Sequence, residues 1–440
     1  MSADLSRVRF DPLRDFSNVV LQQGRVLLDG DFNEFAAIIR RRLAAETVDL
    51  TSFGPDPDHA GSSWVPRHTP DGFRVSLDNG EVTIGRGRMY VDGLLAENHG
   101  VVPLEFDPLL AESTGSEDMP YLDQPWWNTP DPLPDGGTHL AYLDVWDREV
   151  THVEAPDLVE PAIGVDTTAR TQTVWQVRLH PIPAGGPSVS CSTPDDEIPD
   201  WATVIAPSAG LLTVGTIEVD EEDDPCDLPP TGGYRGRENQ TYRIEIHDGG
   251  TVEEATFKWS RENASVVQPV VEMIDPTTLR LASVGRDDVL RISTGDWVEI
   301  VDDNAELNQQ PGVMRSITVD DATSTITFAD PLPADLQPAD ADDADARHLR
   351  VKRWDQSSVV VSATGDTLAD LDDPNSTGLI DVPDSPATQV VLEHGIVVSF
   401  DVAGADGRFH TGDHWIVAAR TASTSVDELV EEPPFGIHHH

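Results

Sequence analysis

From about residue 70 onward, apolar side chains recur at every second position in short runs separated by Gly, Asp and Pro. Phe73, Val75 and Leu77 alternate with polar residues, and the Asp78-Asn79-Gly80 sequence that follows them is typical of a β-hairpin turn. A period of two places alternate side chains on one face of a strand. The pattern therefore predicts a mainly β protein with several small β-sandwich or barrel domains in series.

Residues 277–330 contain five short apolar runs at spacings near ten residues, which is typical of a small barrel or sandwich. The acidic, Ala-rich run at 339–347 that follows is interpreted as a solvated linker. The expected organisation is an N-terminal arm at 1–50, a small β unit at 51–106, a central β domain with long loops at 107–270, a barrel-like domain at 271–348 and a C-terminal β region at 349–440.

Residues 1–50 follow a different period. From Asn33 the spacing predicts an amphipathic helix of about 15 residues, capped by Asp31 or Asn33, after an extended segment with turns at Gly24 and at Asp29-Gly30. Such an arm either lies on the body of its own chain or docks onto a neighbour. The side chains expected to meet a partner are Arg25, Phe35, Ile38, Ile39, Arg40, Arg41, Arg42 and Leu43.

The charge of the chain is strongly unbalanced, with 79 Asp and Glu against 29 Lys and Arg and a formal net charge of -50. Such a surface repels itself in dilute buffer unless salt screens it. Lys258 and Lys352 are the only lysines. The composition therefore favours a protein adapted to near-molar salt, as in the cytoplasm of haloarchaea, and excludes nucleic-acid binding that depends on basic residues displacing counterions.

No run of about 18 apolar residues and no basic region followed by an apolar run is present, so we expect no membrane insertion and no signal peptide. Cys191 and Cys226 lie in neighbouring Pro- and Asp-rich loops and can pair only if folding brings their Cα atoms within about 7 Å. A reducing cytoplasm favours free thiols. Neither cysteine has metal-ligand spacing.

The common catalytic motifs for a serine nucleophile, a phosphate loop, a dinucleotide or a zinc helix are absent from the sequence. Asp144, Asp147 and Glu149 surround Trp146 as glycosidase carboxylates surround a sugar, but such proximity is expected by chance among 79 acidic residues. No catalytic set and no cofactor are expected. Six tryptophans within apolar strand patterns are predicted to be core anchors: 146, 175, 259, 297, 354 and 415.

Eight stretches that together span nearly the whole chain carry a further signal: 20–34, 87–98, 142–179, 225–250, 255–267, 294–303, 407–421 and 433–440. In this order they resemble an uncharacterised protein family found among the genes of contractile injection systems and related phage-tail-like particles. In similar proteins the last stretch leads into more sequence. The resemblance thus implies that this chain is cut short or is an unusually short member.

The resemblance implies a structural component at or near the baseplate, or in a fibre or shell attached to it, without enzymatic activity. Other particle subunits and symmetry-related copies would be its partners, as a homo-oligomer. The chain would lie in the cytoplasm before assembly and afterwards in a particle that is released or faces the cell envelope. Two alternatives stay open: a cell-surface glycan-binding or glycan-cleaving protein, and a soluble scaffold unrelated to any particle.

Overall fold

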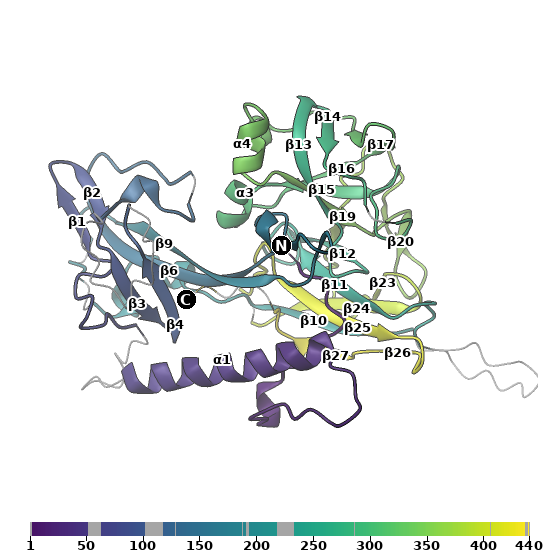
Figure 1. Ribbon diagram of the computed structural model, residues 1–440, viewed down its shortest axis with the longest axis horizontal. Coiled ribbons are helices and arrows are strands. Elements are labelled where there is room, and N and C mark those ends of the chain that lie inside the picture. The colour runs from purple at the N-terminus through teal and green to yellow at the C-terminus, as the bar shows by residue number, and fades with distance from the viewer. Residues whose placement is uncertain are drawn as a thin grey trace, which may run out of the picture.

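The computed structural model describes residues 2–51, 63–101, 118–127, 129–186, 188–190, 193–217, 233–285, 287–404, 406–435 and 439. Strands hold 36% of the chain and helices 13%, which confirms the predicted mainly β fold with one long N-terminal helix (Figure 1). Three groups of strands, each around its own apolar core, make up the body. Cys191 and Cys226 lie outside the described residues.

The N-terminal β unit follows the arm. Its strands are β1 (Val75–Asp78), β2 (Glu81–Ile84), β3 (Gly87–Val91), β4 (Leu94–Asn98), β5 (Met119–Pro120), β6 (Thr138–Val150) and β9 (Arg170–Ile182). The predicted hairpin turn is confirmed, because Asn79 and Gly80 both adopt positive φ between β1 and β2. β6 and β9 pair over their full length as a long antiparallel ribbon, whose buried Val145 and Trp175 pack with Phe73 and Ile84.

Two sheets packed face to face form a sandwich around Tyr242, Phe257, Phe400 and Trp415. One sheet contains β23 (Val390–Val391), β24 (Ile396–Val402), β10 (Gly210–Thr216) and β27 (Leu429–Glu432). The other contains β22 (Ile380–Asp381), β12 (Thr256–Ser260), β11 (Gln240–Ile246), β25 (His414–Arg420) and β26 (Ser425–Val426). Strands from the segments expected as the central and C-terminal domains therefore share both sheets.

A seven-stranded sheet forms a nearly closed barrel, and its strands lie in the sequence between β12 and β20 (Val359–Val361). Its order is β16 (Val313–Ser316), β15 (Trp297–Val301), β19 (Arg350–Trp354), β13 (Val267–Asp275), β14 (Thr278–Leu281), β18 (Thr325–Thr327) and β17 (Thr318–Asp320). The edge strands β16 and β17 are consecutive and separated only by Ile317, so the sheet must curl until its edges meet. Val298, Ile300 and Val351 fill its interior.

Two local predictions in this region are wrong. The apolar run at 289–293 is not a strand and makes only an isolated bridge between Gly285 and Arg291. The expected linker at 339–347 contains helix α4 (Ala341–Ala346), because the Asp340 carboxylate caps it by accepting a hydrogen bond from Asp343 N at 2.9 Å. Ala344 of α4 is fully buried, so the acidic run packs against the barrel.

Short elements complete the described chain: α2 (Trp201–Val204), α3 (Asp303–Leu307), β7 (Val159–Glu160), β8 (Val165–Asp166), β20 (Val359–Val361) and β21 (Thr367–Asp370), with 3-10 turns η3 (Tyr121–Asp123), η4 (Pro156–Leu158), η5 (Asp195–Glu197) and η6 (Ala334–Leu336). The six predicted tryptophan anchors are confirmed, since none exposes more than 8% of its surface. Among the described helices, none has the length and apolar character needed to cross a membrane.

Candidate functional site

The N-terminal arm is built on helix α1 (Asp29–Thr51), which begins four residues before the predicted Asn33 and is longer than expected. The turn predicted at Asp29-Gly30 is wrong, because both residues belong to the first helical turn. The Asp29 carboxylate fixes this start by accepting hydrogen bonds from Ser6 N at 2.9 Å and Ser6 Oγ at 2.5 Å. The negative charges of Asp29 and Asp31 also interact favourably with the positive, N-terminal end of the helix dipole.

The inner side of α1 approaches the body closely. Gly93, in the turn between β3 and β4, lies so near the helix that a Cβ at this position would be 2.5 Å from the Ala44 carbonyl oxygen. Ile38 is buried, and Arg40 forms an ion pair with Asp147 of β6. Burial lowers the pKa of Arg40. Two residues predicted to meet a partner, Ile38 and Arg40, thus contact their own chain instead.

Helix α1 runs along one side of the body (Figure 1), and its outer side carries a second, exposed apolar stripe. Its members recur at spacings of three, four and seven residues, and expose between 39% and 69% of their surface: Phe32, Phe35, Ile39, Leu43 and Leu50. Arg25 and Arg41 are exposed as well, and Arg42 is paired with Glu46 at 2.9 Å. The stripe and these arginines are what remains available of the predicted docking surface.

A loop at residues 10–28 extends this apolar surface. It contains η1 (Pro12–Arg14) and the predicted turn at Gly24, where φ is +70° and Arg25 N donates to Gln22 O. Leu13, Val20 and Val26 expose 89%, 78% and 83% of their surface. The loop is closed at its base by the bonds between Ser6 and Asp29 and by an ion pair between Arg9 and Asp31 at 2.6 Å. Nearly half of the large apolar side chains exposed in the described chain lie between Leu13 and Leu50.

The first residues of the arm, 2–9, are bound to the body as a strap. Ala3 N donates to the Glu149 carboxylate at 3.0 Å, and Asn263 Nδ2 donates to the Ala3 carbonyl at 2.7 Å. Ser2 is 2% exposed. The beginning of the arm therefore lies on its own chain, as does the inner side of α1.

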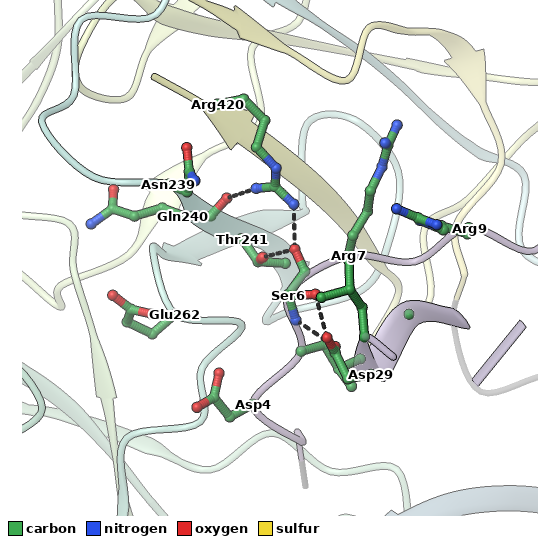
Figure 2. Close-up of a pocket in the computed structure, with 13 residues that line it drawn as sticks. Asp4, Ser6, Arg7, Arg9, Asp29, Asn239, Gln240, Thr241, Glu262 and Arg420 are labelled. Atoms are coloured by element: carbon green, nitrogen blue, oxygen red, sulfur yellow. Dashed lines mark hydrogen bonds between the residues drawn. The ribbon is translucent and has the colours of Figure 1, made fainter. Parts of the chain in front are cut away.

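An open pocket of about 590 Å³ lies between this strap, the start of α1 and the edge of the sandwich (Figure 2). Thr241 Oγ1 donates to the Ser6 carbonyl at 3.0 Å, and the Arg420 guanidinium donates to the same oxygen at 2.5 Å and to Gln240 O at 3.2 Å. The two bonds to the Ser6 carbonyl bind the main chain of the strap and do not depend on its side chains.

Two carboxylates lie on the same side of this pocket, Asp4 of the strap and Glu262 of the body (Figure 2). Burial, together with the charges of Asp4 and Asp355, raises the pKa of Glu262 to about 7. The negative charge of Asp4 thus adds to burial in favouring the protonated form of Glu262.

A second cluster of charges is enclosed between the sandwich and the barrel. Lys258 Nζ lies 2.6 Å from Glu299 Oε1, 3.3 Å from Glu245 Oε1 and 3.0 Å from His247 Nδ1. Both lysines of the chain pack over the Trp354 ring, and Trp354 Nε1 donates to Glu299 at 3.0 Å. Burial opposes ionisation of Glu299, but the charges of Lys258, His247 and Lys352 together outweigh it and lower the pKa of Glu299 to about 2. The cluster joins two sheets.

The carboxylates around Trp146 are engaged within the chain. Asp144 accepts a contact at 2.7 Å from Nδ1 of His439, whose ring packs on Trp146 with centroids 4.5 Å apart. Asp147 binds Arg40 and the Thr173 hydroxyl, and Glu149 binds the strap. Within the described ranges, no three or more His, Cys, Asp or Glu residues form a group that could hold a metal ion.

The fold and the arm thus define a mainly β protein with a strapped, apolar N-terminal arm. A profile described as a family of unknown function (DUF6519) matches residues 1–186 and 204–432. The chain belongs to this family. No curated protein and no solved structure matches the sequence of this chain.

Proposed function

We propose that the chain is a non-enzymatic structural subunit of a contractile injection system or phage-tail-like particle, present in several copies at the baseplate or in a fibre or shell attached to it. The observation that carries an assembly role is the apolar outer stripe of α1. Monomeric proteins rarely expose contiguous apolar surface of this kind unless a partner covers it. The resemblance of eight ordered stretches to proteins of such particles supports this particular assembly.

The form of the arm supports docking. Side chains at spacings of three and four residues on a helix present one continuous face to a partner groove. Covering a fully exposed Phe, Ile or Leu side chain contributes about 1.5–3 kcal/mol, and the stripe residues, which expose 39–69% of their surface, contribute a corresponding fraction each. The strap and the inner side of α1 already bind the body, so the arm is held in place before a partner arrives. Docking therefore costs less conformational entropy than it would for a free arm, and more of the favourable free energy of burial remains.

The proposal is tested by making the stripe polar without touching the body. A variant with Phe35→Gln, Ile39→Gln and Leu43→Gln keeps helix-forming residues at three exposed positions. We expect its incorporation into particles to fall at least tenfold while its thermal unfolding stays unchanged. Incorporation is measured by quantitative mass spectrometry of particles purified from cells that express the variant.

The matched control is Leu77→Gln on strand β1, outside the arm, where an equally apolar side chain is 70% exposed. This variant should enter particles as the unmodified chain does. Normal incorporation of the triple variant would refute the proposed role of α1. Deleting the whole arm is a poorer test, because Ser2 and Ile38 are buried in the body and their loss would disturb the fold.

A further inference from the structure

We propose that the partner of the arm is the acidic body of a neighbouring copy of this chain, so that copies join head to tail. This inference rests on the proposed function and names the partner of the same surface. It is carried by the distribution of charge between arm and body, by the contacts the arm already makes, and by the positions of Arg25, Arg40 and Arg42.

The charge of the chain resides almost wholly in its body. Residues 1–50 contain seven arginines and eight acidic residues, a net charge of -1, whereas residues 51–440 carry -49 of the total. Two bodies of this charge repel each other. The arm is the part of the surface that can approach a second copy without that penalty, and each copy supplies one arm and one body.

Contacts within the chain show that the body accepts the chemistry of the arm. Arg7 of the strap forms an ion pair with Asp427 near the sandwich edge at 3.0 Å, and Arg40 of α1 pairs with Asp147 of β6. The exposed Arg25 adjoins Val26 and Leu27 of the apolar surface that the arm leaves uncovered. It is placed to make the same kind of contact with carboxylates of a second body.

The position of the arginines disfavours a symmetric pairing of two α1 helices. An antiparallel pair that matches the stripes would place Phe32 opposite Leu50 and Ile39 opposite Leu43. Both matches have their midpoint at residue 41, so Arg40 and Arg42, which flank the stripe, would each approach their counterparts near the symmetry axis. A parallel pair would place each arginine beside its own counterpart. Like charges at such distances destabilise a contact.

A contact between an arm and a different surface of the next copy leaves one free arm and one free body at the ends of every oligomer. Such a contact closes into a ring when its rotation divides the full circle, and otherwise grows into a filament. A ring of this kind would arrange several copies around an axis, each held by the arm of its neighbour.

Charge reversal at Arg25 distinguishes the two geometries. Self-association of the purified full chain is measured by sedimentation at the lowest salt concentration at which the chain stays folded. We expect Arg25→Glu to weaken self-association at least tenfold and Arg25→Lys to change it less than threefold. Unchanged self-association of Arg25→Glu would overturn the proposal, because a symmetric pairing of two α1 helices does not involve Arg25.

A mixing experiment gives an independent test. The Phe35→Gln, Ile39→Gln, Leu43→Gln variant, carrying an affinity tag, is mixed with untagged unmodified chain and recovered on the tag. In a head-to-tail contact the variant still offers its body, so it captures unmodified chain but ends each oligomer. In a symmetric contact every mixed pair contains one polar stripe, so the variant captures no unmodified chain. That result would overturn the proposal.

Failure of this inference is distinguishable from failure of the proposed function. If the pure chain does not self-associate at any salt concentration while the triple variant is lost from particles, the arm docks on a different subunit and only the present inference is overturned. If the triple variant both self-associates and enters particles normally, the proposed function is overturned as well.

Discussion

At the scale of single residues, Glu262 makes stability depend on pH in an unusual direction. Most native carboxylates have a lowered pKa, so stability is lost in acid. Burial and the neighbouring Asp4 and Asp355 instead raise the pKa of Glu262 to about 7, well above its unfolded value of 4.5. The folded chain therefore binds the proton more tightly, and this contribution to stability is lost as pH rises from about 4.5 to about 7.

We predict that Glu262→Gln removes this loss. The quantity compared is the free energy of unfolding of the variant minus that of the unmodified chain. This difference should rise by about 1 kcal/mol between pH 5 and pH 8. The shift in pKa alone would give a larger change, but Glu262 is only half-buried and solvent screens its charge. Denaturant unfolding at constant salt measures it. Comparing two chains cancels other titrating groups, among them His247, whose pKa burial lowers to about 4 and which destabilises the fold as pH falls below about 6.5. A difference that does not change with pH would contradict the prediction.

At the scale of elements, the attachment of α1 depends on the turn between β3 and β4. Gly93 adopts φ of +82° in this turn and lies against Ala44 of the helix. Gly80 adopts φ of +87° in the turn between β1 and β2 with no neighbouring atom within 4 Å. The two glycines therefore share backbone strain on substitution but differ in their contact with the arm.

We predict that Gly93→Ala destabilises the chain by at least about 1 kcal/mol more than Gly80→Ala, because only the first drives a methyl group into the helix main chain. Hydrogen exchange should show faster exchange of α1 amides in Gly93→Ala alone. Equal effects of the two substitutions would mean that α1 does not depend on this contact.

Elements with a strong local signal were predictable from the sequence, and those decided by distant contacts were not. The hairpin at Asn79-Gly80 and the apolar repeat of α1 follow from the residues themselves. The run at 289–293 has strand-like residues but finds no partner strand, and α4 forms because Asp340 caps an Ala-rich run that packs on the barrel. The sharing of sheets by β10 and β24 joins residues nearly two hundred positions apart, which no local pattern encodes.

The same distinction holds for the arm. Phe35, Ile39 and Leu43 were predictable as one stripe because helical spacing is a local property. The strap was missed because Thr241, Arg420 and Asn263 bind its main chain, which carries no side-chain signal. Ile38 was assigned to the partner surface because spacing alone does not say which side of a helix the body covers.

At the scale of the whole molecule, the charged cluster around Lys258 connects the sandwich to the barrel. Lys258 lies on β12, while Glu299, its nearest partner, lies on barrel strand β15. Glu299 also accepts hydrogen bonds from Trp354 Nε1 and Gly312 N. These neutral donors do not replace a cation, so the junction depends on the lysine.

We predict that Lys258→Met lowers the free energy of unfolding by about 3–5 kcal/mol, because it leaves the buried Glu299 charge without its partner. The matched control is Arg42→Met, which removes a cation from an exposed pair with Glu46 and should cost about 0.5 kcal/mol or less. Denaturant unfolding measures both. A loss below about 1 kcal/mol for Lys258→Met would show that the junction does not need this ion pair.

The burial of Lys258 and Lys352 also determines how the chain responds to reagents. With 2% and 7% of their surfaces exposed, neither lysine side chain presents an amine to an aldehyde or an activated ester while the fold is intact. Fixatives that bridge amines will therefore not link these side chains between neighbouring copies, and carbodiimide coupling at carboxylates is the suitable choice. Any acylation that does appear at the two lysines reports, by mass alone, that the sandwich and the barrel have separated.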